Sequence, residues 1–223
     1  MAPEMPQLEG IYLLTPDVGA RAFDTVLNVV QQSLLAGVRA IQYRDKSVGV
    51  TRRLERACQL VALTRAEGAL LIVNDSVDIA LSAGADGVHL GRDDGDVADA
   101  RRKLPHQLIG VSCYNELDRA SAAVAAGADA IAFGSIYASR TKPLAIRAGL
   151  SLLSDARAAW PQQRIIAIGG INADNVATVA AAGADAAAVL EAIFGAVNPA
   201  AAARELVQRF NEGHADCRHR LQT

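Results

Sequence analysis

The 223-residue chain has few aromatic residues, few cysteines and no excess of charge of either sign. Aromatic side chains make up 4% of the sequence, and the formal net charge at pH 7 is -2. Without a basic excess, the composition does not support a nucleic acid or an anionic membrane surface as partner. Three cysteines without a C-x-x-C pair argue against a disulfide framework or a zinc ribbon, so we expect reduced thiols.

Targeting signals are also missing. Residues 1–6 contain no basic segment, and Asp129 and Asp185 interrupt the alanine-rich stretches, which predicts neither a signal peptide nor a membrane span. We therefore expect a cytoplasmic protein with small-molecule substrates. Whether it forms a homo-oligomer is left open.

Short apolar runs, each ending in polar residues or glycine, are typical of buried parallel strands, and helical patterns fill the gaps between them. The strands are predicted at residues 10–14, 38–43, 69–73, 86–89, 108–112, 129–133, 164–168 and 185–189. Between the first two, Phe23, Val26, Leu27, Val30 and Leu34 form one apolar helical stripe.

A helix-to-strand junction recurs four times, at Gly37, Gly84, Gly127 and Gly183, and each glycine is expected to cap a helix. Their separations of 47, 43 and 56 residues each hold about two βα units. The sequence therefore predicts a single-domain (β/α)8 TIM barrel over residues 1–212. A doubly wound open sheet is the alternative, but no G-x-G-x-x-G follows the first strand.

After the barrel, residues 213–223 form a polar tail that contains His214, Cys217 and His219. Close His and Cys spacing can bind a metal, but polar chain ends are more often solvated and poorly ordered. We expect the latter. The final helix before this tail is expected to begin at Asn198-Pro199.

Cationic side chains cluster at the end of the second predicted strand. Gln42, Arg44 and Lys46 are two residues apart, so an extended chain places them on one side. An Arg and a Lys facing the interior of a sheet need a reason, because unpaired buried charge is costly. A phosphorylated ligand would provide one.

Acidic residues follow the third and fourth predicted strands. Asp75 lies at the end of the third predicted strand, and Asp94 lies just past the fourth. One carboxylate from each loop, with substrate phosphates and water, could hold Mg²⁺. Either could instead cap a helix: Asp75 the helix beginning at Ser76, and Asp93 or Asp94 the next one.

Two later loops could bind phosphate. The loop after the sixth strand contains Ser139, Arg140, Thr141 and Lys142, which could wrap a phosphate or form an ordinary polar loop. After the seventh strand, Gly169-Gly170 would let backbone amides approach a phosphate, at the usual phosphate site of such barrels. His89, the only histidine expected near the barrel mouth, is more readily interpreted as a packed, hydrogen-bonded imidazole than as a catalytic one.

These motifs resemble the thiamine phosphate synthase family from about Ile11 to Phe210. The segments that carry the resemblance are Gln42-Tyr43-Arg44-Asp45-Lys46, Val73-Asn74-Asp75, Gly84-Ala85-Asp86-Gly87-Val88-His89-Leu90-Gly91, Ile109-Gly110-Val111-Ser112, Ser139-Arg140-Thr141-Lys142 and Ala167-Ile168-Gly169-Gly170-Ile171. The resemblance implies a transferase that joins hydroxymethylpyrimidine diphosphate to thiazole phosphate and releases diphosphate.

The resemblance also implies roles for individual residues. The residues expected to bind the diphosphate-bearing aminopyrimidine are Gln42, Arg44, Lys46, Asn74, Ser112 and Lys142, and Tyr43, Asp45 and Arg140 lie within the same substrate-binding motifs. Those expected to face the thiazole phosphate are Ser139, Thr141, Gly170, Leu190 and Glu191. Arg44, Lys46, Ser112 and Lys142 would be catalytic. Asp75 and Asp94 would hold the Mg²⁺ cofactor.

The chain departs from the family's commoner pattern at three positions. Arg92 replaces a frequent Gln, Ser139 a frequent Thr, and Glu191 a frequent Ser. A carboxylate facing a phosphate would repel it, so the Glu191 side chain is expected to turn away while backbone amides bind.

Two other functions are considered. A thiazole tautomerase of the same superfamily would have a His after the fifth-strand Ser112, where this chain has Cys113. A barrel that binds a phosphorylated ligand without turning it over is the second alternative.

Overall fold

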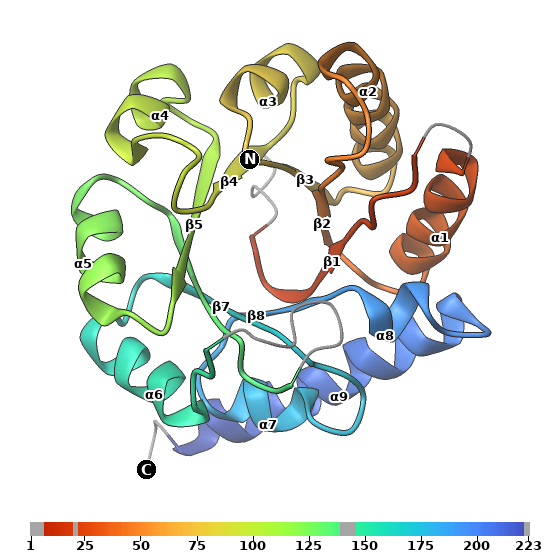
Figure 1. The fold of residues 1–223 in the computed structure, drawn as a ribbon. Coiled ribbons are helices and arrows are strands. Elements are labelled where there is room, and N and C mark those ends of the chain that lie inside the picture. Colours follow the sequence, from red (N-terminus) through yellow and green to blue (C-terminus); the bar gives the residue numbers. More distant parts are fainter. Residues whose placement is uncertain (1–6, 20–21, 139–145, 221–223) are drawn as a thin grey trace, which may run out of the picture.

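The computed structural model describes residues 7–19, 22–138 and 146–220, which form a closed barrel of parallel strands surrounded by helices (Figure 1). The strands are β1 Gly10–Leu14, β2 Ala40–Tyr43, β3 Leu70–Asn74, β4 Gly87–Leu90, β5 Leu108–Tyr114, β6 Ala130–Phe133, β7 Arg164–Ile168 and β8 Ala186–Val189. The helices are α1 Phe23–Leu35, α2 Val50–Ala66, α3 Val77–Ala83, α4 Val97–Lys103, α5 Leu117–Ala125, α6 Leu150–Ala159, α7 Val176–Ala181, α8 Glu191–Phe194 and α9 Pro199–Arg220.

The predicted (β/α)8 barrel is confirmed, and the open sheet is wrong because β8 pairs with β1. The strands lie close to their predicted ranges, with two differences that affect the site. Strand β5 continues past residue 112 through an irregularity between Ser112 and Tyr114. Strand β2 ends at Tyr43, so Arg44 and Lys46 lie in the following loop and not on a face of the strand.

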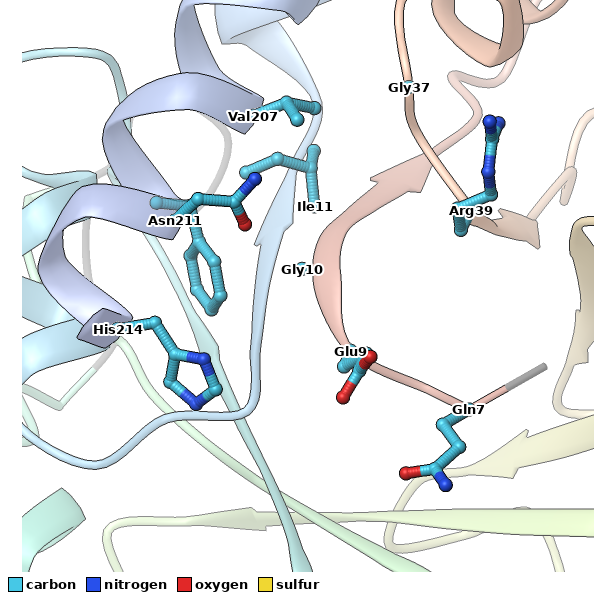
Figure 2. Close-up of a pocket in the computed structure, with 10 residues that line it drawn as sticks. Gln7, Glu9, Gly10, Ile11, Gly37, Arg39, Val207, Asn211 and His214 are labelled. Carbon is cyan, nitrogen blue, oxygen red and sulfur yellow. The ribbon is translucent and has the colours of Figure 1, made fainter. Parts of the chain in front are cut away.

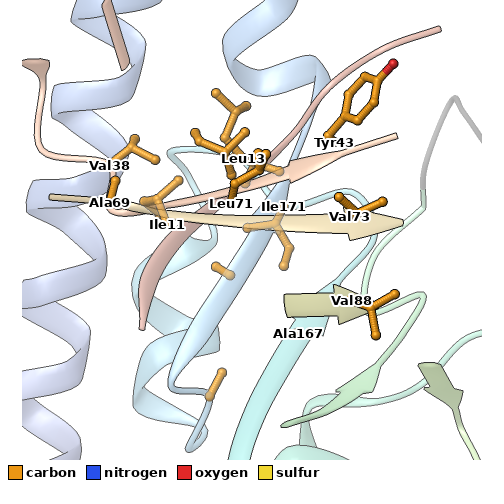
Figure 3. Close-up of a cluster of buried hydrophobic side chains, with 14 of the residues drawn as sticks. Ile11, Leu13, Val38, Tyr43, Ala69, Leu71, Val73, Val88, Ala167 and Ile171 are labelled. Carbon is orange, nitrogen blue, oxygen red and sulfur yellow. The ribbon is translucent and has the colours of Figure 1, made fainter. Parts of the chain in front are cut away.

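Side chains that alternate along each strand fill two separate cores. Outward-facing residues such as Ile11, Leu71 and Val88 pack between the strands and the surrounding helices (Figure 3). Inward-facing residues, including Tyr12 and Ile72, fill the barrel together with alanines from β6 and β8. The two cores leave the strand ends as the places where polar side chains can gather.

The repeated glycines end helices, as predicted. Gly37, Gly84, Gly127 and Gly183 have φ values of 104°, 68°, 98° and 106°. This left-handed region is readily available only to glycine, and it turns the chain from a helix into the next strand.

Three aspartates that follow these glycines fasten neighbouring strands together. Their carboxylates accept backbone N–H groups of the preceding strand at 2.7 to 2.8 Å, joining Asp86 to Leu71, Asp129 to Ile109 and Asp185 to Ile165. The backbone N–H of each aspartate also donates to the carbonyl of the same partner residue. Two bonds to one residue set the register of β3 with β4, β5 with β6, and β7 with β8.

Arginines on alternate helices complete the repeat. Each donates to the carbonyl of the helix-ending glycine, pairing Arg65 with Gly84, Arg101 with Gly127 and Arg157 with Gly183. Arg101 and Arg157 also form ion pairs with Asp129 and Asp185. In the first copy Arg39 replaces the aspartate and donates to the Leu34 and Val38 carbonyls.

Helix α9 packs against α7 and α1 and begins where the sequence predicts. The Asn198 side chain accepts the Ala201 N–H at 3.0 Å, which caps the helix. The helix runs on to Arg220, past residue 212, where the polar tail is expected to begin. The rings of Phe210 and His214, one helical turn apart on α9, lie 5.8 Å from each other.

Two further observations bear on chemistry and environment. Cys58 is exposed and Cys113 is buried, and both are free thiols. Within the described ranges, none of the helices has the length and apolar character required to cross a membrane.

Replacing Asp185 with Ala should lower the free energy of unfolding by about 2–3 kcal/mol, because the Ile165 N–H and the Arg157 guanidinium both lose a charged partner. Urea denaturation measures this. The matched control is Asp78→Ala, whose side chain is 84% exposed and should change stability by less than about 0.5 kcal/mol. Equal effects in the two variants would show that the aspartate does not hold the strands in register.

Candidate active site

Polar side chains from four consecutive strands face into the C-terminal end of the barrel, which we call the mouth. They are Gln42 on β2, Asn74 on β3, His89 on β4 and Ser112 on β5. Strands β6 and β8 contribute the small inward-facing residues Ala132 and Ala188. One side of the mouth is therefore polar and the other small and apolar, an arrangement that can orient a flat polar ring.

Hydrogen bonds hold this polar wall in place. The Gln42 side-chain amide donates to the Tyr12 hydroxyl at 2.9 Å inside the barrel. His89 Nε2 lies 2.9 Å from the Ser112 hydroxyl. The side chains are thus oriented before any ligand binds.

His89 is a buried, neutral imidazole. Burial lowers its pKa to about 4, although the nearby Asp75 carboxylate acts in the opposite direction. Gly110 provides the space for the ring, since a Cβ at that position would lie 2.6 Å from His89 Nδ1. The structure thus supports the packed, hydrogen-bonded imidazole that the sequence favours.

The two cations that follow β2 lie above the barrel and are paired with acids. Arg44 Nη1 lies 2.6 Å from the Asp17 carboxylate, which also accepts the Lys46 backbone N–H at 2.6 Å. Although burial acts to raise it, the pKa of Asp17 is held below its usual range by these hydrogen bonds from Lys46 and Arg44. Asp17 thereby fixes the path of the loop.

A buried ion pair holds the same loop against α2. Asp45 pairs with Arg56 of α2, and their side chains are only 1% and 3% exposed. Asp45 also accepts the Ser47 N–H at 2.9 Å, while Arg56 donates to the Gly19 carbonyl at 2.5 Å. This network joins α2 to the loops that follow β1 and β2.

Two expected substrate-binding side chains do not reach the mouth. Tyr43 points outward, with its ring 6.2 Å from that of Phe23 on α1. Asp45 is occupied by Arg56. Tyr43 thus lies on the outer face of the strand and Asp45 supports the loop, and substrate contact by either side chain stays a prediction.

The structure brings Lys46, Asp75 and Asp94 together. Lys46 Nζ lies 2.7 Å from Asp75 Oδ2, and Asp94 Oδ2 accepts the Gly91 N–H at 2.8 Å. Burial raises the pKa of Asp94, and so does its hydrogen bond with Asp75, in which protonated Asp94 donates to the Asp75 carboxylate. Two carboxylates within hydrogen-bonding distance repel each other when both are ionised, so the pair is suited to a cation.

Neither carboxylate caps a helix. Ser76 accepts the Ile79 N–H at the start of α3, and Asp96 accepts the Asp99 N–H at the start of α4. Asp75 instead has a φ of 66°, an uncommon value for a residue other than glycine. The capping alternatives are therefore wrong for Asp75, Asp93 and Asp94.

The acidic pair fits magnesium better than zinc. The described residues contain no group of three or more His, Cys, Asp or Glu side chains that could hold a metal on their own. Magnesium commonly takes only one or two carboxylates and completes its shell with phosphate oxygens and water. Asp75 and Asp94 suit that requirement.

Ser139, Arg140, Thr141 and Lys142 lie outside the described residues. The neighbouring glycines have a clear steric role. A Cβ at Gly169 would lie 2.2 Å from Ser135 Oγ, and one at Gly170 would lie 2.3 Å from the Ala138 carbonyl oxygen. Glycine at these positions lets the loops after β6 and β7 pack together.

Glu191 begins α8, directly after Leu190. Its Oε1 lies 2.6 Å from where a Cβ on Gly195 would be, so the carboxylate runs along the helix toward its C-terminal end. That the Glu191 side chain turns away from a bound thiazole phosphate, while backbone amides bind it, stays a prediction.

Sequence reasoning missed several residues of the mouth. Tyr12, Asp17 and Arg119 each hold an expected site residue or its loop. Tyr12 lies two residues before Leu14 on β1, so the two side chains share the inward face, and this spacing could have identified Tyr12. Nothing local links Asp17 or Arg119 to the site.

A cavity of about 360 Å³ lies at the opposite end of the barrel. It is bordered by Glu9, Gly10, Arg39, Asn211 and His214, near the beginnings of β1 and β2 (Figure 2). It contains none of the candidate residues, and barrel enzymes carry their chemistry at the C-terminal ends of the strands. The mouth is therefore the candidate active site.

Comparison with known sequences agrees with this assignment. A family model described as thiamine monophosphate synthase matches residues 11–193. A thiamine-phosphate synthase of Chromobacterium violaceum is 51% identical over 208 residues, covering 92% of this chain and 98% of the relative. One from Halorhodospira halophila is 49% identical over 214 residues, covering 94% of this chain and 98% of the relative.

Solved structures give the same result. Thiamine phosphate pyrophosphorylase from Pyrococcus furiosus superposes with a TM-score of 0.82 at 34% identity, covering 92% of this chain and 96% of that one. A 3-hexulose-6-phosphate synthase, with a TM-score of 0.64 and 21% identity, shares the fold alone. The chain belongs to the thiamine monophosphate synthase family.

Proposed function

We propose that the chain is a magnesium-dependent thiamine phosphate synthase, a transferase that joins hydroxymethylpyrimidine diphosphate to thiazole phosphate. The relatives that carry this name match nearly the whole chain. The observation that carries the proposal is the cluster of Lys46, Asp75 and Asp94 beside a polar barrel wall. This cluster combines a phosphate-binding cation with a carboxylate pair that suits Mg²⁺.

The proposed reaction is a dissociative substitution. The carbon–oxygen bond to the diphosphate breaks, the diphosphate leaves with the electron pair, and the thiazole nitrogen then uses its lone pair to form the carbon–nitrogen bond. Arg44 and Lys46, with Lys142, would stabilise negative charge as it develops on the leaving group. Bound Mg²⁺ would supply further positive charge to the diphosphate oxygens.

The barrel wall would hold the aminopyrimidine. Gln42 and Asn74 offer amide groups, and the Ser112 hydroxyl is oriented by neutral His89. A neutral imidazole adds no positive charge beside the cation that is left when diphosphate departs, so the wall can orient the ring without opposing the reaction.

The thiazole phosphate would bind on the other side of the mouth. Gly170 and the turn at Leu190-Glu191 would offer backbone N–H groups, with Ser139 and Thr141 as hydroxyl donors and Arg140 nearby. The Glu191 carboxylate points along α8, which is compatible with an anion at this turn. A cytoplasmic location stays a prediction.

The synthase is preferred to a thiazole tautomerase. A tautomerase needs no diphosphate site, yet this chain keeps Lys46 paired with Asp75 and next to Asp94. Cys113 follows Ser112, is fully buried, and has a pKa raised to about 12 by that burial. It would be a poor acid or base in place of the histidine expected in that branch.

The direct test mixes the purified protein with both phosphorylated substrates and follows thiamine phosphate by mass spectrometry. We expect product with Mg²⁺ and a loss of product when EDTA removes the metal. Folded protein that forms no product in either condition would contradict the synthase assignment. Product that is unaffected by EDTA would contradict the metal requirement alone.

Replacing Asp75 with Asn should lower kcat about 100-fold, because the amide keeps the shape of the side chain and removes the charge proposed to hold Mg²⁺. Steady-state kinetics measures this, and circular dichroism should show an unchanged fold. Asp78→Asn, on the exposed side of α3, is the control and should keep normal turnover. Normal turnover in the Asp75 variant would refute its metal role.

Replacing Glu191 with Ala should leave the KM for thiazole phosphate unchanged, because the carboxylate already points along α8 toward Gly195. The measurement is a substrate titration at saturating pyrimidine diphosphate. A sharp decrease in KM at constant kcat would show that the native carboxylate repels the phosphate after all.

A further inference from the structure

One arginine of α5 connects two parts of the mouth. Arg119 Nε donates to the Ser112 carbonyl at 2.7 Å, and its Nη2 donates to the Gly91 carbonyl at 3.1 Å. Ser112 belongs to the polar wall, and Gly91 begins the loop that carries Asp94. A single planar guanidinium thus sets the distance between the strand and the loop.

Gly91 also contacts the Asp94 carboxylate. Its carbonyl accepts from Arg119, and its own N–H donates to Asp94 Oδ2 at 2.8 Å. A Cβ at Gly91 would lie 2.6 Å from that same oxygen, so the carboxylate rests directly on the glycine. Arg119 is therefore linked to the Asp94 side chain through one residue.

Tyr114 provides a surface for the same loop. Its φ of 56° is uncommon for a non-glycine residue. The guanidinium carbons of Arg92 and Arg119 lie 5.0 and 5.8 Å from its ring centre, at cation–π distance. Arg92 also pairs with Glu116 at 2.6 Å, which ties the loop to the start of α5.

We propose that Arg119 is a positioning residue for the metal site: it holds the Asp94 carboxylate in place relative to Asp75 and Ser112. This role rests on the proposed magnesium-dependent function. Arginine suits it because its rigid fork can donate to two carbonyls at once, which a lysine ammonium on a flexible stem cannot reproduce. Loss of such an outer-shell contact typically weakens metal binding about 10- to 100-fold.

The test is calorimetric titration of Mg²⁺ into the full chain in the presence of inorganic diphosphate. We expect Arg119→Met and Arg119→Lys to raise the Kd for Mg²⁺ about 10-fold. In assays, the Mg²⁺ concentration for half-maximal activity should rise similarly, with kcat at saturating Mg²⁺ near that of the unmodified protein.

Arg101→Met is the matched control, because Arg101 also donates to backbone carbonyls between neighbouring units, but at the opposite end of the barrel. It should lower the melting temperature and leave the Kd for Mg²⁺ unchanged. A Kd unchanged in both Arg119 variants would overturn the positioning role, as would equal weakening by Arg101→Met. Absence of Mg²⁺ binding to the unmodified protein would instead refute the metal site itself.

Discussion

The register between paired strands is the constraint on which the rest of the structure depends. Asp86, Asp129 and Asp185 each make two hydrogen bonds to one residue of the preceding strand, at the end of the barrel far from the mouth. Because side chains alternate along a strand, a slip of one residue would turn His89 or Ser112 outward. Contacts at one end of the barrel therefore determine which residues meet at the other.

At the mouth, the cationic side chains already form ion pairs with acidic residues when no ligand is bound. Arg44 and Lys46 already have acidic partners, and the buried Asp45–Arg56 pair holds their loop to α2. A bound diphosphate would replace these carboxylates as the partner of Arg44 and Lys46. The proposed binding therefore needs little rearrangement of the backbone. Removal of one partner of the buried pair would leave an uncompensated charge, typically at a cost of about 3–5 kcal/mol.

Backbone strain marks the same region. Asp75 and Tyr114 are the non-glycine residues with positive φ within the described ranges, and both lie where a strand enters a mouth loop. Such conformations cost about 1–3 kcal/mol each and persist only where surrounding contacts hold them. Asp75 is held by its ion pair with Lys46. Tyr114 is held by the guanidinium groups of Arg92 and Arg119 over its ring.

The sequence by itself determined the eight strands, the glycines that end helices and the start of α9, because apolar runs and left-handed glycines are local signals. It also identified Asp75 and Asp94 as a pair, through strand order. Only the tertiary structure decided what Tyr43 and Asp45 contact, namely Phe23 of α1 and Arg56 of α2. The same holds for Asp17 and Arg119, whose partners lie on other units of the barrel. Such contacts leave no local pattern, because they arise only when barrel closure brings distant loops together.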